Sequence, residues 1–155
     1  MAIFNDSSDL QQYLINHNLF DYQKLIDEFD IDIVRTNEMP ETLLGLAVPR
    51  TRTIFINSAP SPVGETFVLI HELTHVLMGV ESAAFYKSSY VSTRKNEVVA
   101  NNGAFFILVR EFINQWGIDK SHFNIESFLS YYRIPPMYYF QTEAFIAQHA
   151  DEIFA

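Results

Sequence analysis

The 155 residues suffice for one domain, and a hydrophobic content of 48% is enough to bury a core. The absence of cysteine excludes disulfides, catalytic thiols and thiolate metal ligands, so a metal site would have to use histidine and carboxylate ligands. The formal charge of −9 argues against direct binding of DNA or RNA, because phosphate contacts require a concentrated basic surface, but it does not exclude a basic protein partner.

The first 58 residues are expected to form short helices followed by a small sheet. The N-terminal helices are predicted within residues 1–30, and alternating apolar residues then predict strands at 31–34, 43–48 and 53–57. We therefore assign residues 31–58 to a small, largely antiparallel sheet. No signal peptide is visible at the N-terminus, and the longest apolar runs of the chain, such as residues 104–109, are too short to span a bilayer, so a cytoplasmic location is expected.

Residues 62–78 are predicted to form a buried helix. Ser61 and Pro62 suit the N-cap and the first turn, and Gly79 is a natural stop. Apolar residues lie on both sides of the polar residues 71–75, and a surface helix would not be so apolar.

The centre of this helix, His71-Glu72-Leu73-Thr74-His75, is the HExxH pattern of zinc peptidases. Histidines four residues apart lie about one helical turn apart, so both imidazoles can reach one ion. Glu72 projects near the same face and is placed to accept a proton from a water on the metal. Burying two imidazoles and a carboxylate costs free energy unless another group interacts with them, and a zinc ion would supply that interaction. The alternative is a metal-free helical domain in which both histidines are core residues with backbone partners.

The rest of the chain is predicted to be mainly helical, after an irregular stretch at residues 80–92. Thr93 can cap a long helix at 94–116, which Gly117 ends. Further helices, interrupted by a Pro-Pro pair, are expected within residues 124–155. The order of helices, sheet and helices predicts the α+β class, with the sheet packed on a helical bundle that contains the HExxH helix.

A catalytic zinc site needs a third protein ligand and leaves one position for water. The downstream candidates are acidic or histidine side chains, namely Glu81, Glu97, Glu111, His122, Glu126, Glu143 and His149. Glu81 lies where metzincins place their third histidine, but the glycine of that pattern is displaced by one residue. Glu97 is favoured because it opens the next predicted helix, and Asn101 follows on the same face, placed to accept a ring N–H from a metal histidine. The alternative for Glu97 is a solvated glutamate near a helix N-terminus.

Three segments together resemble the ImmA/IrrE family of zinc metallopeptidases, namely residues 53–57, 67–77 and 97–106. The family pattern is a strand ending in Asn, then HELGH, then E-x-x-A-N-x-F-A. The chain departs from it in two places, with Thr74 in place of the usual Gly and with Asn102-Gly103-Ala104 shifting the register after Asn101. The resemblance covers about residues 25–110.

This resemblance implies a zincin-like single domain over residues 1–155, with a gluzincin-like site. Zinc would be bound by His71, His75 and Glu97, and Glu72 would be the general base. It also implies an anti-repressor: a cytoplasmic enzyme, often carried by phages and mobile elements, that cleaves or inactivates a helix-turn-helix repressor. The chain is therefore expected to be a zinc-dependent endopeptidase. The alternative is a non-hydrolytic zinc-containing protein that inactivates a regulator by binding.

Two further features of the site are left open by the residues. Oxyanion stabilisation is expected from a side chain besides the metal, with Tyr86, Tyr90, His122 and Tyr132 as candidates. A substrate strand is expected to pair with an exposed sheet edge, either residues 44–48 or residues 53–57.

Overall fold

The computed structural model describes residues 3–17, 21–80, 82–85 and 95–154. Helices in these residues are α1 (Ser7–Asn16), α2 (Tyr22–Glu28), α3 (Glu65–Met78), α4 (Lys95–Trp116), α5 (Ile125–Tyr131) and α6 (Tyr139–Ile153). Strands are β1 (Asp32–Thr36), β2 (Leu43–Val48), β3 (Thr53–Asn57) and β4 (Ser82–Phe85). The fold is α+β, which confirms the class predicted from the sequence.

The strands form one sheet in the order β1-β3-β2-β4. Strand β2 runs antiparallel to β3 and β4, whereas β1 runs parallel to β3, so the sheet is small and largely antiparallel, as predicted. Strand β4 corrects the prediction that residues 80–92 are irregular. The sequence of β4, Ser-Ala-Ala-Phe, has little strand propensity. The segment is a strand because it pairs with β2, and not because of a local preference.

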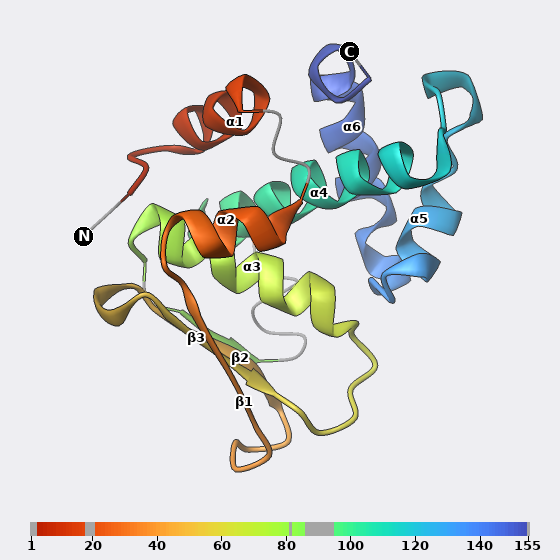
Figure 1. Cartoon of the computed structure of the whole chain (residues 1–155). Helices are drawn as coiled ribbons and strands as arrows, with labels where there is room; N and C mark the ends of the chain where they lie inside the picture. Colours follow the sequence, from red (N-terminus) through yellow and green to blue (C-terminus); the bar gives the residue numbers. More distant parts are fainter. Residues whose placement is uncertain (1–2, 18–20, 81, 86–94, 155) are drawn as a thin grey trace.

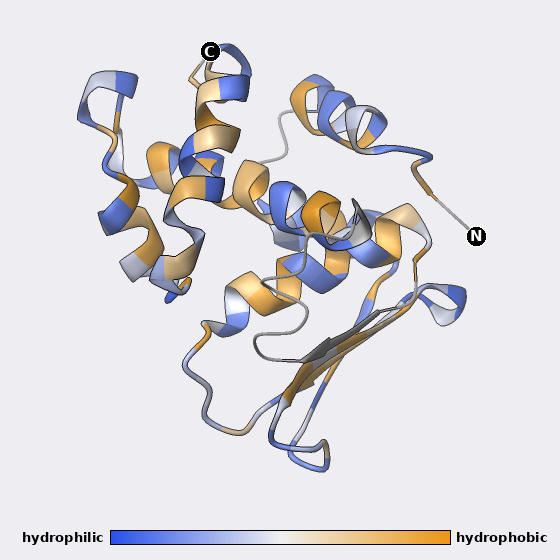
Figure 2. Cartoon of the chain, turned by 180° about the vertical axis from the view of Figure 1, so that it is seen from behind, coloured by the Kyte–Doolittle hydropathy of each residue, from blue (hydrophilic) through white to orange (hydrophobic). Residues whose placement is uncertain are grey.

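The helices lie on one side of the sheet (Figure 1). Helix α3 packs on β2 and β3, α4 packs on α3, and α1 and α6 pack on α4. The buried side chains of Ala47, Ile54 and Ile56 lie on these two strands, and Figure 2 shows apolar stretches along the strands and along α3. The sheet and α4 thus enclose α3, which explains why this helix is apolar on most sides.

Helix α3 begins at Glu65, three residues later than predicted. Gly64 is its N-cap residue, and the Gly64 N–H donates to the Arg133 carbonyl oxygen at 3.0 Å. A Cβ on Gly64 would lie 1.9 Å from the Tyr132 carbonyl oxygen, so only glycine fits here. Contact with the end of α5, and not the local sequence, therefore sets the start of α3. Ser61 instead accepts a hydrogen bond from the Val63 N–H, in a turn before the helix.

One hydrophobic core joins the two ends of the chain, with Leu10 and Leu14 contributed by α1 and Phe145 by α6. Helix α4 begins at Lys95 in the described part of the chain, and the predicted cap Thr93 lies outside it. Helix α6 is kinked at His149, whose backbone is not helical. In the described residues we find no helix with the length and hydrophobicity that crossing a membrane requires.

Candidate metal centre

Helices α3 and α4 bring His71, His75 and Glu97 together. In the described residues, this is the only group of three or more such side chains whose ligand atoms lie close enough to share an ion, all within 4.8 Å of one another. The Nε2 atom of His71 lies 3.1 Å from one carboxylate oxygen of Glu97, and the Nε2 atom of His75 lies 3.1 Å from the other. The two histidines are buried, whereas the Glu97 side chain is 15% exposed.

The tautomer of His71 shows why a cation fits this group. Its Nδ1 atom lies 2.8 Å from the Oδ1 atom of Asn101, which only accepts, so Nδ1 carries the ring hydrogen. Burial lowers the pKa of His71, which favours the neutral ring. The Nε2 lone pair of this neutral ring then faces a carboxylate oxygen of Glu97. Both atoms are acceptors, so they cannot hydrogen-bond to each other, whereas a metal ion bound by both would make their close approach favourable. The residues present therefore fit a metal.

Glu97 has an electrostatic environment suited to a carboxylate ligand. Burial by itself raises the pKa of Glu97, but where His71 and His75 donate to the carboxylate in the absence of a metal, these contacts outweigh burial and lower the pKa to about 2, and a cation in their place would act in the same direction. Glu97 is therefore ionised at neutral pH. Two imidazole nitrogens and one carboxylate oxygen form the donor set that catalytic zinc sites use.

Glu72 lies beside the group without joining it. Its side chain is fully buried, and one carboxylate oxygen lies 3.8 Å from the Nε2 atom of His71. Neither carboxylate oxygen has a hydrogen-bond partner in the described residues. Burial, and then the charge of Glu97, raise the pKa of Glu72 well above its usual range. A buried carboxyl group with both oxygens available next to a cation site can exchange a proton with a small molecule bound there.

Gly45 holds the backbone of β2 against Glu72. A Cβ at Gly45 would lie 3.0 Å from Glu72 Cγ and 3.0 Å from Val68 Cγ1. The pairing of β2 with β4 shifts register between Leu43 and Gly45, which marks a bulge next to this contact. The role of Gly45 was not predicted from the sequence, although an isolated glycine within a strand pattern signals the close approach of another element.

Gly103 performs a similar role between the two helices of the site. A Cβ there would lie 2.6 Å from the Thr74 Oγ1 atom and 2.8 Å from its Cγ2 atom. The two departures from the ImmA/IrrE pattern are thus in contact, and the glycine on α4 makes room for the threonine on α3. Ala100 and Ala104, which flank Gly103, are also buried and let the helices approach closely.

The other candidate ligands are not part of this group. His122 is exposed and lies 2.6 Å from Asp119. Glu111 is fourteen residues along α4 from Glu97, or about 21 Å. It accepts the Tyr132 hydroxyl at 2.7 Å, so Tyr132 is also poorly placed as an oxyanion donor. Glu126 lies on α5, and Glu143 and His149 lie on α6. Three candidates fall outside the described residues, namely Glu81, Tyr86 and Tyr90.

Comparison with known proteins identifies the family. The family model Peptidase_M78, described as the IrrE N-terminal-like domain, matches residues 26–117, a span that includes β1 to β3 and helices α3 and α4. No curated protein and no solved structure matches the chain. Because the family match spans more than half of the sequence, the chain belongs to the ImmA/IrrE family of metallopeptidases, as its motifs predicted.

Proposed function

We propose that this protein is a zinc-dependent endopeptidase that hydrolyses a peptide bond in a protein partner. The observation that carries the proposal is the convergence of His71, His75 and Glu97 on one point, with the buried carboxyl group of Glu72 beside it. A structural metal site has no use for such a carboxyl group, whereas peptide hydrolysis requires a proton acceptor in that position.

The two imidazoles and the Glu97 carboxylate would hold the metal. Zinc suits these three ligands, and when bound it supplies Lewis-acid activation of water and of the scissile carbonyl group. Asn101 keeps the Nδ1 hydrogen on His71 and thereby directs the Nε2 lone pair of that ring toward the ion.

Glu72 would move the proton during hydrolysis. As the water oxygen forms a bond to the scissile carbonyl carbon, Glu72 accepts a proton from that water. The same carboxyl group then donates this proton to the leaving nitrogen as the carbon–nitrogen bond breaks. Glu72 has no hydrogen-bond partner in the described residues, which leaves its carboxyl group available for both transfers.

The sheet offers an edge to an extended substrate, although not one of those expected from the sequence. Strands β2 and β3 each pair with two neighbours, so the expectation that either is a free edge is wrong. Among the described residues the edges are β1 and β4; β4 packs against α3, whereas β1 reaches only the start of α3 through the ion pair of Arg35 with Glu65. We propose that substrate backbone pairs with β4, next to the helix that carries the metal ligands.

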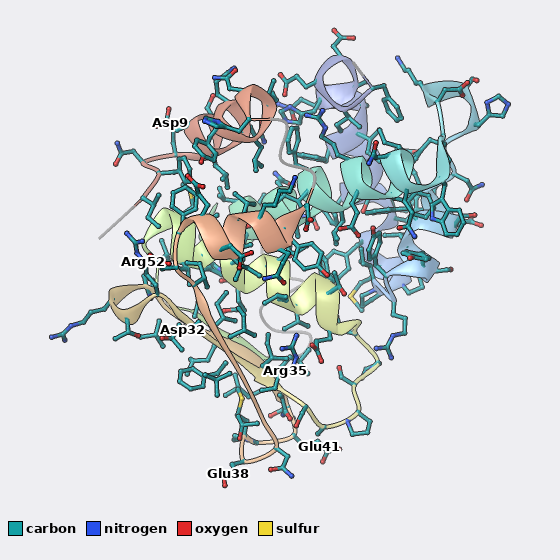
Figure 3. The ribbon with its side chains drawn as sticks, viewed as in Figure 1. Asp9, Asp32, Arg35, Glu38, Glu41 and Arg52 are labelled. Atoms are coloured by element: carbon teal, nitrogen blue, oxygen red, sulfur yellow. The ribbon has the colours of Figure 1, made fainter. Side chains whose placement is uncertain are left out.

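We propose that the partner is a helix-turn-helix repressor of a phage or mobile element, encountered in the cytoplasm. Two observations support this partner. The chain belongs to the ImmA/IrrE family, and its acidic surface, with Glu38 and Glu41 exposed on the loop between β1 and β2 (Figure 3), suits a basic DNA-binding protein.

Co-expression with the repressor encoded beside the gene tests this proposal. Wild-type protein should yield discrete repressor fragments, Glu72→Gln should yield none, and the exposed Glu143→Gln variant should act as wild type. If Glu72→Gln relieves repression as well as wild type does, with no fragments in either case, the non-hydrolytic alternative is correct.

Metal analysis tests the site independently of hydrolysis. We expect about one zinc per chain in wild type and in Glu72→Gln, with strong loss in His71→Ala, His75→Ala and Glu97→Ala. Undiminished zinc in a variant lacking both histidines would refute the assignment.

A further inference from the structure

The start of α6 exposes apolar side chains that the proposed catalysis does not use. Phe140 is the most exposed large apolar residue among the described ones, with an exposed fraction of 78%, and Met137 is 51% exposed. Both belong to the segment in which the 3-10 helix η3 (Pro136–Tyr138) continues into α6. Single exposed apolar side chains are common, whereas a contiguous exposed apolar surface marks an interaction site, so the surroundings of these two residues decide their meaning.

A groove beside these two residues makes the apolar surface continuous. It has a volume of about 420 Å³ and lies between α5 and the start of α6. The residues that line it are mostly apolar and are Glu126, Leu129, Ser130, Ile134, Pro136 and Tyr139. The Tyr139 ring contacts the Phe140 ring, with centroids 5.5 Å apart, and Met137 directly follows Pro136. We call the groove, Phe140 and Met137 together the α5–α6 surface.

Aromatic contacts connect the α5–α6 surface to the metal group. Tyr138 precedes the groove residue Tyr139 and is buried. Its ring centroid lies 5.8 Å from that of Phe67 on α3, and the Phe67 ring lies 6.4 Å from that of His71. The end of α5 also contacts the start of α3, beside which it lies in Figure 1. A protein bound to the α5–α6 surface would therefore lie close enough to present a second segment to the metal group.

The charge of the α5–α6 surface favours a basic partner. Among the residues that line the groove, Glu126 carries the only charge, and it is exposed. The whole chain has a formal charge of −9. A second copy of this chain would bring Glu126 against the same acidic surface, and an anionic membrane would also be repelled. An apolar segment flanked by lysine or arginine would instead be attracted.

The walls of the groove suit a helix. All six lining residues lie in α5, in α6 or in the connection between them, and none belongs to a strand. An extended segment needs the free backbone groups of a sheet edge, whereas an amphipathic helix lays its apolar face into a groove of apolar side chains. Phe140 and Met137 stand beside the groove and would pack against such a helix.

We propose that the α5–α6 surface is an exosite, a binding site outside the catalytic centre, for an amphipathic helix of the protein substrate with basic residues beside its apolar face. The proposal rests on the proposed peptidase function and adds a second contact with the same partner, distinct from the segment that pairs with β4. A partner that offers both a basic amphipathic helix and an extended segment would be selected over proteins that offer the extended segment alone.

Calorimetry tests this exosite without hydrolysis. The zinc-loaded Glu72→Gln protein is titrated with the helix-turn-helix repressor encoded beside the gene. Adding Phe140→Ala should weaken binding about 10- to 100-fold, as loss of an aromatic anchor at an interface predicts. Trp116→Ala is the matched control, because Trp116 is also an exposed aromatic residue, at 56%, but is not in the groove lining, and this variant should bind as its parent does.

Two further measurements test the charge and the link to catalysis. Glu126→Lys should weaken binding of the repressor, and more so at low than at high ionic strength, because salt screens the charges of an exposed site. With Glu72 intact, Phe140→Ala should raise the KM for cleavage of the repressor and leave kcat unchanged, because the exosite binds the substrate away from the scissile bond.

The outcomes separate the exosite from the peptidase. Unchanged binding in Phe140→Ala, or an equal loss in Trp116→Ala, overturns the exosite and leaves the peptidase intact. Concentration-dependent dimers that Phe140→Ala abolishes assign the surface to a second copy and also overturn the exosite. Binding that depends on Phe140 without any cleavage by the wild type supports the docking surface and overturns the peptidase. Failure of the wild type both to bind and to cleave the repressor overturns the two proposals together.

Discussion

The contact between Gly103 and Thr74 makes a prediction about the packing of the two site helices. In Gly103→Ala the new Cβ would lie 2.6 Å and 2.8 Å from the Thr74 Oγ1 and Cγ2 atoms. Alanine gains about 1 kcal/mol over glycine in a helix interior, whereas overpacking a buried contact costs about 1–3 kcal/mol. The cost is expected near the upper end, because rotation of Thr74 away would break its hydrogen bond to the Ile70 carbonyl oxygen. The free energy of unfolding should fall by about 1–2 kcal/mol, or a few degrees in Tm.

The same substitution should be tolerated once Thr74 is shortened. Thr74→Ala removes both close atoms and leaves only the Cβ, which would lie 3.2 Å from the new methyl group. Gly103→Ala in the Thr74→Ala background should therefore be close to neutral, which gives a coupling energy of about 1–2 kcal/mol between the two positions. The pair would then be interdependent, as expected if the two departures from the family pattern offset each other.

Urea denaturation of the four proteins, followed by circular dichroism in the presence of a chelator, measures this coupling. Zinc affinity gives a second readout, because a wedge between α3 and α4 should move Glu97 away from His71 and His75 and weaken binding. Unchanged stability in Gly103→Ala would refute the predicted overpacking. A loss of stability that is the same in both backgrounds within about 0.5 kcal/mol, the usual limit of additivity, would refute the coupling to Thr74.

Two other changes probe the surroundings of the site. Asn101→Ala should weaken zinc binding by about 10- to 100-fold in a competition assay, since His71 loses the acceptor that fixes its tautomer, and unchanged affinity would refute this role. Burial raises the pKa of Glu111, so its contribution to stability is full below its unfolded pKa and is lost as pH rises through the folded value. Glu111→Gln, which still accepts from Tyr132, should therefore stabilise the fold at pH 7 and progressively less toward pH 4, and denaturation at both pH values without metal checks this.

The elements that could be predicted from the sequence are those determined by local residues. The HExxH helix was recognisable from its apolar flanks and from Gly79, which adopts the left-handed C-cap conformation with φ of 73°. The start of this helix could not be predicted, because Gly64 is fixed by a contact with a segment some seventy residues later in the chain. The parallel pairing of β1 with β3 and the existence of β4 likewise depend on partners distant in sequence, which strand propensity does not encode.

The candidate site divides in the same way. The spacing of His71 and His75 within one helix predicts a shared ion, and the four-residue spacing of Glu97 and Asn101 predicts a shared face, because helical periodicity is local. The candidate oxyanion donors could not be ranked in this way, since the placement of Tyr132 beside Glu111 depends on how α5 packs on α4. The contact of Gly45 with α3 could not be predicted from the sequence either, because it depends on the register of the sheet.

The environment of Glu72 links the stability of the fold to the proposed chemistry. Strand β2 closes over this carboxyl group through Gly45, whose missing side chain allows the backbone to approach and exclude water. Exclusion of water raises the pKa of Glu72 and makes its ionised form costly to the folded protein. A bound cation would offset that cost by stabilising the charged carboxylate, and in the proposed mechanism it would also activate the water from which Glu72 accepts a proton. The dry surroundings of Glu72 would thus serve the proposed chemistry and also make the folded site depend on its metal.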